Sequence, residues 1–433
     1  MIDFLMTLPA FLKVSLIFVS ILAACKGGLP LGISILLHSL ALTLWSGAGF
    51  AGLGSQLQSF VQPESYLLFL VILLLQFFTE ALSKSGRMSR TVDALRAWMS
   101  SHKTLVAGLP ALVGLLPMPG GALFSAPLVE SVDTQARIRP PVKVAINYWF
   151  RHIWEYWWPL YPGVIMAIRY SKIPVGIYLL VMAPFTIAAV LGGYFFILRH
   201  VKTDKHTEKS GQLDRRAIAA TLFPISILVA FAVTGSIILP SFGVEKSIAN
   251  LLSMLAGLVV GLGLVFMSSP NAFRASLPQI FSQTTAMLML VIIGVQSFSS
   301  ALSTPIDETT TIVSLMRDEF VGFGIPVALM IVLLPFVSGA VTGIAVGFVG
   351  ASFPLVFALL SPQPSLQMLV VTTVLAYSFG YIGMLLSPVH VCLVVTNEFF
   401  KTRLYHAYPL LVGPLTTVLV SAFALAALYY FVF

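Results

Sequence analysis

Charged side chains are scarce in this sequence. Only 9% of its 433 residues are Asp, Glu, Lys or Arg, whereas 58% are hydrophobic, and the mean hydropathy is +0.97. Soluble globular domains carry charge on about a quarter of their residues, so the composition excludes that class. Many apolar runs reach the ~20 residues that a membrane-spanning helix needs. The sequence therefore predicts an all-α polytopic membrane protein.

Cysteines and catalytic motifs are also scarce. Cys25 and Cys392 both lie in or beside apolar runs, so no disulfide framework is indicated. The sequence has no HExxH metal motif, no phosphate-binding P-loop and no evident nucleophile–base pair, which makes a membrane enzyme the weakest functional hypothesis. The net charge of +8 falls in short loops between apolar runs, where it indicates orientation rather than nucleic-acid binding.

Proline and glycine interrupt two apolar runs at corresponding places. The run at 105–129 includes LLPMPGGALFSAPLV, and the run at 323–360 includes LLPFVSGAVTGIAVGFVGASFPLV. Proline removes a backbone donor and glycine lacks a side chain that favours a helix, so each run is predicted to form a re-entrant helical hairpin. Lipid cannot satisfy the backbone groups freed at such tips. Broken helices in both halves of a chain are typical of a transporter's substrate site.

The other apolar runs form two sets of five, with each hairpin between the third and fourth run. They lie at 5–24, 29–50, 65–82, 141–168 and 174–198, and at 217–239, 247–267, 281–301, 366–396 and 406–432. We therefore predict two repeats, 1–200 and 217–433, joined by a cytoplasmic linker at 201–216. An odd number of spans in each repeat makes the second repeat inverted in the membrane.

Two kinds of residue pattern support this arrangement. The segments 147–163 and 376–392 align without a gap, with matches at Tyr148/Tyr377, Phe150/Phe379, Ile153/Ile382 and Pro159/Pro388. Eighteen of the 24 Lys and Arg fall in cytoplasmic segments if the N-terminus is outside. This bias predicts that both termini lie outside the cell membrane. The basic segment 85–101 is predicted to lie on membrane lipid, with 305–320 as its acidic outer counterpart.

The stretches PMPGGALFSAPLV, NYWFRHIWEYWW and FGYIGMLLSPVHVCLVVT resemble an uncharacterised integral membrane permease family within the ion-transporter superfamily. That superfamily includes divalent-anion/sodium symporters and citrate, gluconate and arsenite permeases. The resemblance covers nearly the whole chain and implies inverted repeats, an elevator-type transporter fold and a homodimer. Sodium-coupled dicarboxylate members carry Ser-Asn-Thr at the hairpin tips, whereas this chain has Met118-Pro119-Gly120 and Ser338-Gly339-Ala340. That departure puts sodium coupling and a dicarboxylate preference in question.

We therefore predict a secondary active transporter that moves a small organic anion, preferably a carboxylate, across the cytoplasmic membrane by alternating access. Protons or sodium would drive it, and Na+ is the one candidate for a bound coupling ion. The alternatives are an ion channel, which needs a path open at both ends, or a facilitative uniporter. The predicted partners are the anionic substrate, membrane lipids and a second copy of the chain, with no nucleic acid.

The predicted substrate-binding residues lie at the hairpin tips and at or near the breaks in the fourth runs, which Pro159 and Pro388 predict at 158–163 and 387–390. They are Pro119, Gly120, Gly121, Ser125, Asn147, Ser338, Gly339, Thr342 and Ser387. Free amides at helix N-termini favour anions, and unwound carbonyls near Gly120, Ser338 and Ser387 could hold sodium. The alternative is that these glycines only allow close helix packing.

Arg151, His152, Glu155 and His390 are the predicted ion-coupling residues. Arg151 and Glu155 are four apart in a predicted helix, so they would share one face and form a pair. Glu155 or His390 could carry a proton, or the pair and a buried histidine could be structural. The neighbouring tryptophans are predicted to form an interfacial belt rather than to bind a ligand; they are Trp149, Trp154, Trp157 and Trp158.

Overall fold

The computed structural model describes all residues except 1–7, 100, 117–120, 134, 202–211 and 308–309. The described part is helical, and its only β-structure is an isolated bridge between Pro305 and Thr311. The helices are α2 (Ala10–Lys26), α3 (Leu31–Trp45), α4 (Gly49–Phe60), α5 (Pro63–Lys84), α6 (Arg87–Trp98), α7 (His102–Gly114), α8 (Gly121–Val132), α9 (Pro140–His152), α10 (Pro162–Ser171), α11 (Val175–Met182), α12 (Pro184–Gly192), α13 (Arg215–Ile238), α14 (Lys246–Ser268), α15 (Pro270–Ile280), α16 (Gln283–Ser303), α17 (Ile312–Gly322), α18 (Val327–Thr342), α19 (Ala345–Ala358), α20 (Leu366–Leu386), α21 (Val391–Phe399) and α22 (Leu404–Val432).

The length and hydropathy of these helices make the chain a multi-pass membrane protein. Among the described residues, seven helices are long and apolar enough to cross a membrane, and eight if the bent pair α17–α18 is one span. The sequence predicted ten spans. The three that fall short are α2 with 17 residues, α3 with 15 residues, and the fourth run, which divides into α9 and α10.

Side chains just before several helices fix where those helices begin. The Oγ of Ser282 accepts a hydrogen bond from the Thr285 amide at the start of α16, and the Oγ of Ser365 accepts one from Met368 at the start of α20. Such caps satisfy amides that have no partner within the helix. The capping residues therefore place both helix starts, and the α16 start borders the cavity described below.

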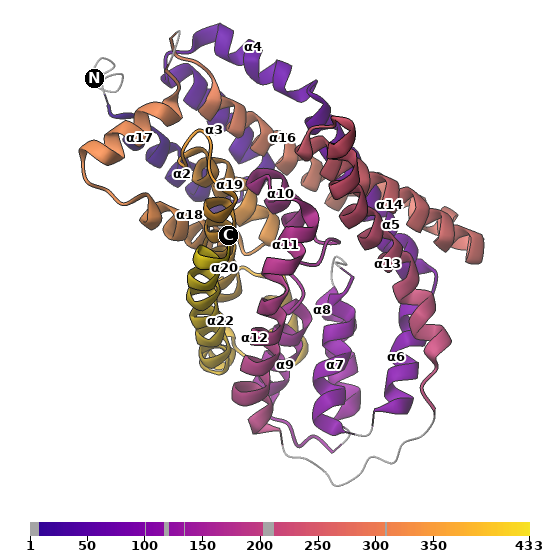
Figure 1. Ribbon diagram of the computed structural model, residues 1–433. Coiled ribbons are helices and arrows are strands. Elements are labelled where there is room, and N and C mark those ends of the chain that lie inside the picture. The colour runs from indigo at the N-terminus through magenta and orange to yellow at the C-terminus, as the bar shows by residue number, and fades with distance from the viewer. Residues whose placement is uncertain (1–7, 100, 117–120, 134, 202–211, 308–309) are drawn as a thin grey trace.

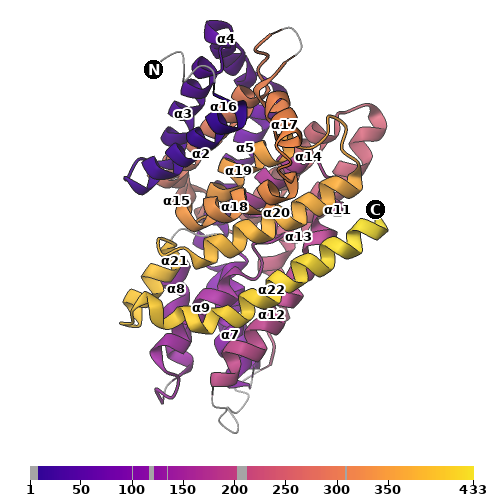
Figure 2. The ribbon, with the colours of Figure 1, turned by 90° about the vertical axis from the view of Figure 1, so that its left-hand side faces the viewer.

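The helices pack in two groups. In one group, α3 packs along α16, and α14 packs against α5 and α13. In the other, α20 lies between α18 and α22, and α9 contacts α7, α8 and α22. The first group lies across the upper part of Figure 1, and α7, α9, α12 and α22 lie below it. The same separation is visible after the 90° turn in Figure 2. A substrate cavity between the two groups would be bordered by both.

Close contacts between backbones hold both groups together. A Cβ at Gly32 of α3 would overlap the backbone of Leu290 in α16. A Cβ at Gly339 of α18 would likewise overlap the carbonyl oxygen of Gly380 in α20. The small residue at Gly339 therefore has a packing function, as the alternative interpretation of the sequence proposed.

Both predicted hairpin runs form two helices that pack on each other, α7 with α8 and α18 with α19. The first tip, including Pro119 and Gly120, lies outside the described residues. At the second tip, Gly343 has φ +64°, a left-handed conformation that favours glycine. Ile344 follows in an extended conformation before α19 begins.

The fourth run of each half is broken. The first is interrupted between His152 and Pro162, and the second between Leu386 and Val391. The second pieces, α10 and α21, begin 229 residues apart (391 − 162), the offset that also relates Tyr148 to Tyr377. The first break begins earlier than Trp158, where the sequence placed it.

The structure also contains helices between the predicted spans. The segments 85–101 and 305–320, predicted as surface connectors, contain α6 and α17. Two more helices, α4 and α15, were not predicted. Both are short, with 12 and 11 residues, and neither is apolar enough to stand out from its surroundings.

Candidate substrate cavity

A cavity of about 650 Å³ lies where the two groups of helices meet. One side is formed by the starts of α3 and α16 and by Gln76 of α5. The other side is formed by the broken segment between α9 and α10 and by the starts of α19 and α21. This volume lies within the range of about 300–1,000 Å³ that is typical of small-molecule sites.

Five helix N-termini border this cavity: α3 and α16 begin on one side, and three more helices begin on the side of Arg151. These three starts are the first residues of α10 (Pro162 and Gly163), α19 (Ala345 and Val346) and α21 (Val391 and Cys392). The first amides of a helix have no intrahelical partner, and the aligned peptide dipoles place partial positive charge at that end. The cavity therefore has an electrostatic preference for an anion.

Arg151 adds a full positive charge to the same wall. It lies in the last turn of α9, is 4% exposed and lines the cavity. Its Nη1 lies 2.9 Å from the Sγ of Cys392 on α21. A Cβ at Gly121 would overlap the Nη2 of Arg151, so glycine at the start of α8 is what allows the guanidinium to approach the first hairpin.

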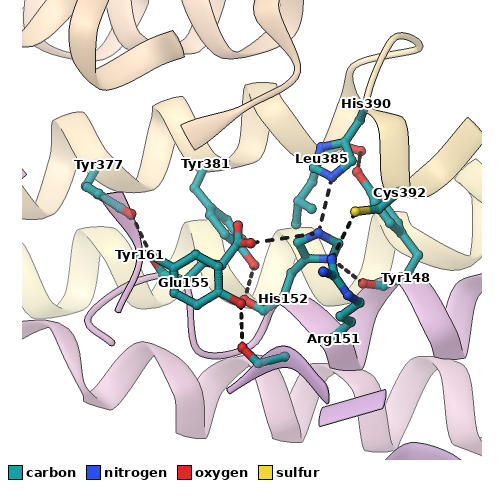
Figure 3. Close-up of polar contacts among 11 residues, drawn as sticks. Tyr148, Arg151, His152, Glu155, Tyr161, Tyr377, Tyr381, Leu385, His390 and Cys392 are labelled. Atoms are coloured by element: carbon teal, nitrogen blue, oxygen red, sulfur yellow. Dashed lines mark hydrogen bonds and ion pairs between the residues drawn. The ribbon is translucent and has the colours of Figure 1, made fainter. Parts of the chain in front are cut away.

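Two histidines and a carboxylate lie beside Arg151 (Figure 3). The Nδ1 of His152 lies 2.5 Å from the carbonyl oxygen of Tyr148 and must donate to it, since a carbonyl only accepts. In the neutral ring this leaves a lone pair on Nε2 of His152. That atom lies 3.2 Å from Nε2 of His390 and 3.9 Å from Oε1 of Glu155. The three side chains could pass a proton among them.

Tyrosine hydroxyls satisfy the backbone carbonyls that the breaks leave free. Tyr381 and Tyr377 of α20 donate to the carbonyls of His152 at 2.7 Å and Glu155 at 2.5 Å. In the opposite direction, Tyr148 of α9 donates to Leu385 of α20 at 3.0 Å. Buried carbonyls without partners would be costly at membrane depth, so these bonds stabilise the breaks.

The segment between α9 and α10 is also tied to the first hairpin. Tyr161 donates to the carbonyl of Gly114 at 2.5 Å, and Trp158 and Trp154 donate to Leu115 and Ala111 at 2.9 and 2.8 Å. These carbonyls belong to the C-terminal end of α7. The broken segment thereby satisfies the carbonyls of the hairpin arm and joins the two elements.

A metal ion is one possible ligand of this cluster. The donor atoms of His152, His390 and Cys392 lie within 4.8 Å of one another, and these residue types bind zinc or copper. The guanidinium of Arg151 already contacts the same sulfur, and its positive charge opposes a cation at that position. The arrangement therefore matches an anion better than a metal.

The structure brings together all four predicted ion-coupling residues, Arg151, His152, Glu155 and His390, as cavity-lining residues. The expected helical pairing of Arg151 with Glu155 is wrong in its geometry. Helix α9 ends at His152, so Glu155 does not lie one helical turn beyond Arg151. Glu155 lies beside His152, and Arg151 contacts Cys392.

The predicted substrate-binding hydroxyls do not line the cavity. Ser125, Ser338 and Thr342 donate to carbonyls of their own helices, those of Ala122, Leu334 and Ser338. Ser387 is buried beside Gly343 at the second tip. Gly121 lies against Arg151 and Gly339 against α20.

Asn147 lies in the core between α9 and α21. Its Nδ2 donates to the Oγ1 of Thr396 at 3.0 Å, and its buried Oδ1 has no hydrogen-bond partner among the described residues. The predicted tryptophan belt is wrong for Trp149. Trp149 is buried in the core and donates to the carbonyl of Ala189, whereas Trp157 is partly exposed and donates to Thr186.

Sequence reasoning missed Cys392 and Tyr161 as cavity residues. Cys392 aligns with Gly163 in the repeat, and both lie at the start of a helix that borders the cavity. This repeat position was a signal that could have identified Cys392. The contributions of α3 and α16 had no such signal, because they depend on how the two groups of helices pack.

The model of the family described as "Protein of unknown function (DUF401)" matches residues 10–433. The chain belongs to this family. No curated protein matches it. Among solved structures, the DUF401 chain is similar to the YdaH transporter of Alcanivorax borkumensis, described as having an unusual topology. The two share 14% identity and a TM-score of 0.57 over 92% of this chain and 97% of the other, so they share a fold.

Proposed function

We propose that this protein is a secondary active transporter that moves a small organic anion, preferably a carboxylate, across the cytoplasmic membrane. The observation that supports this most is the cavity in which Arg151 and the starts of α10, α19 and α21 meet. A guanidinium offers a planar set of donors that matches a carboxylate. The neighbouring helix starts add partial positive charge without adding a second cation.

Alternating access is supported by the repeated arrangement of breaks and hairpins. The half-helix α10 packs on α19 of the second hairpin, and α21 packs on α8 of the first. Each half of the chain thus supplies a half-helix to the hairpin of the other. This exchange suits inverted repeats around a central site. We propose that the two hairpins and the half-helices α9, α10 and α21 form one moving unit, which moves past α3, α5 and α16 in an elevator-type step.

The contacts on α10 indicate which side of the cavity is closed. Arg169, near the end of α10, forms a 2.7 Å ion pair with Glu64 of α5 and donates to Gln296 of α16 at 3.2 Å. The cavity borders the opposite end of α16, where Gln283 and Thr284 are exposed. With both termini outside, as the basic loops indicate, this is a cytoplasm-facing state.

We propose that Glu155, with His152 and His390, couples transport to protons, with sodium near Ser338 and Ser387 as the alternative. The other ionisable groups around this cluster include Arg151, Cys392 and the tyrosines Tyr148, Tyr161, Tyr377 and Tyr381. Glu155→Gln is expected to bind substrate but to lose accumulation driven by a pH gradient. Uptake that still follows the pH gradient in this variant would remove Glu155 from the coupling step.

The test of the transport function is uptake into proteoliposomes. We expect organic anions to be taken up saturably and to exchange with the same anion inside the vesicle, with no accompanying conductance. A channel would conduct without saturable exchange, and that result would replace the proposal. The same vesicles show whether the protein is a homodimer. They also show whether transport depends on anionic lipid, as the basic helix α6 predicts.

A further inference from the structure

We infer that the substrate is a monocarboxylate with a hydrophobic body, an inference that rests on the proposed function and narrows it to one substrate class. The two sides of the cavity differ in their chemistry. The charged and ionisable side chains lie on the side formed by the α9–α10 break and the start of α21. The opposite side is apolar or neutral.

The charged side has room for one carboxylate. Among the described residues that line the cavity, Arg151 is the only one that is permanently cationic, and Glu155 is the only one with a carboxyl group. A substrate with a single carboxylate can pair with Arg151. A second carboxylate on the same substrate would meet no second guanidinium or ammonium group among these residues.

The opposite wall is built to contact hydrocarbon. Leu31 comes from α3, and Met287, Leu288 and Val291 come from α16. The polar residues on the side of α5 and α16 are neutral amides and a hydroxyl. A carboxylate placed here would lose hydration without meeting a cationic side chain among the described lining residues, so this wall disfavours a second charge.

The size of the cavity predicts that longer acids bind more tightly than shorter ones. Its volume of about 650 Å³ corresponds to roughly twenty water molecules at ~30 Å³ each. A two-carbon acid bound at Arg151 leaves the apolar wall in contact with water. Each added methylene removes more apolar surface from water, which corresponds to roughly a threefold to fourfold gain in affinity.

The experiment measures the affinity of the purified protein in nanodiscs for acetate, butyrate and hexanoate, with adipate and hexanamide as comparisons. We expect affinity to rise about threefold per methylene from acetate to hexanoate, and adipate and hexanamide to bind more weakly than hexanoate. Adipate adds a charge at the apolar wall, and hexanamide removes the charge that pairs with Arg151.

Two matched variants on α16 locate the apolar contact. Val291→Thr replaces a methyl group on the cavity wall by a hydroxyl without changing size, and should reduce the gain per methylene while leaving acetate affinity unchanged. Val295→Thr makes the same change one turn along the helix, outside the cavity lining. It should change neither the gain in affinity per methylene nor the affinity for acetate. A chain-length series that is flat, or adipate binding more tightly than hexanoate, would overturn this inference and leave the anion transporter standing. A complete absence of binding by all the acids would overturn both.

Discussion

The hydroxyl of Tyr381 in α20 donates a 2.7 Å hydrogen bond to the backbone carbonyl of His152, the last residue of α9. Both residues are buried. The bond joins a helix of the second half of the chain to the break in the first half. It therefore fixes the end of α9 from which Arg151 and His152 reach the cavity.

Tyr381→Phe tests this connection. Removal of the hydroxyl leaves a buried carbonyl without its donor, which is expected to cost about 1–3 kcal/mol in the free energy of unfolding. Thermal unfolding in nanodiscs measures the loss. Tyr408→Phe is the control, because its hydroxyl also donates to a carbonyl, that of Leu386 at 3.2 Å, but the side chain is half-buried and does not bond to the end of α9. Equal losses of unfolding free energy in the two variants would show that the bond to His152 stabilises the fold no more than the bond to Leu386.

The accessibility of Cys392 tests whether the cavity is the substrate site. In a Cys25→Ser background, Cys392 is the only thiol in the chain. A small thiol reagent should modify it through the cavity, and a bound anion should protect it because the anion occupies the space beside Arg151. Cys392→Ser, which retains Cys25 on α2, is the matched control and should be labelled equally with and without the anion. Labelling of Cys392 that the transported anion does not affect would place the substrate elsewhere.

The ion pair between Glu64 and Arg169 tests whether α10 moves against α5. In a cysteine-free background, Glu64→Cys with Arg169→Cys places one thiol on each side of the 2.7 Å contact. A short thiol-specific crosslinker should stop transport, because it joins the proposed moving unit to α5. The control pair is Glu130→Cys with Lys143→Cys, which replaces the 2.7 Å ion pair between α8 and α9 within that unit. Crosslinking this second pair should leave transport unchanged. Full transport by the first crosslinked pair would contradict an elevator-type movement.

Asp133, in the loop between α8 and α9, gives the fold a predictable pH dependence. Burial alone would raise the pKa of its carboxyl. The ion pair with Lys143 at 2.8 Å and the backbone amides of Ile138 and Arg137 outweigh this, and the pKa lies below its ordinary value. A carboxylate with a lowered folded-state pKa stabilises the fold fully above its unfolded pKa of about 3.9, and this stability is lost as the pH falls further.

Asp133→Asn should therefore lower the free energy of unfolding at pH 7 by about 1–3 kcal/mol, which is measured as a lower melting temperature. The melting temperature of this variant should also fall less on acidification than that of the wild type. Glu130→Gln is the control, because Glu130 also pairs with Lys143 but is half exposed, and its effect should be smaller. An unchanged acid dependence in Asp133→Asn would show that other carboxylates determine it.

The overall fold could largely be predicted from the sequence, because its determinants are local. Apolar length indicated the long helices, and Pro159 and Pro388 indicated the breaks in the fourth runs. The repeat offset also held for the starts of α10 and α21. The span predicted at 29–50 was too long, since hydropathy does not show that α3 ends at Trp45, just before a turn in which Gly47 has a positive φ.

The site could be predicted only in part, because side-chain direction depends on tertiary packing. Arg151 and Glu155 were identified by their charge within an apolar run, but their partners were not, since α9 stops between them. Gly339 shows the same limit. It was expected at the substrate, but a Cβ there would overlap α20. Gly339→Val should therefore disrupt packing and cannot report on binding.

The central claim is that Arg151 binds the carboxylate of a transported anion. The most direct measurement is the equilibrium binding of hexanoate to purified wild-type, Arg151→Gln and Arg151→Lys protein, with Arg87→Gln as the control. Arg87 is also a buried arginine, but it donates to Ala220 and Ser268, away from the cavity. The account predicts that Arg151→Gln abolishes binding, that Arg151→Lys retains part of it by keeping the charge, and that Arg87→Gln binds normally. Unchanged affinity in a folded Arg151→Gln variant would contradict it.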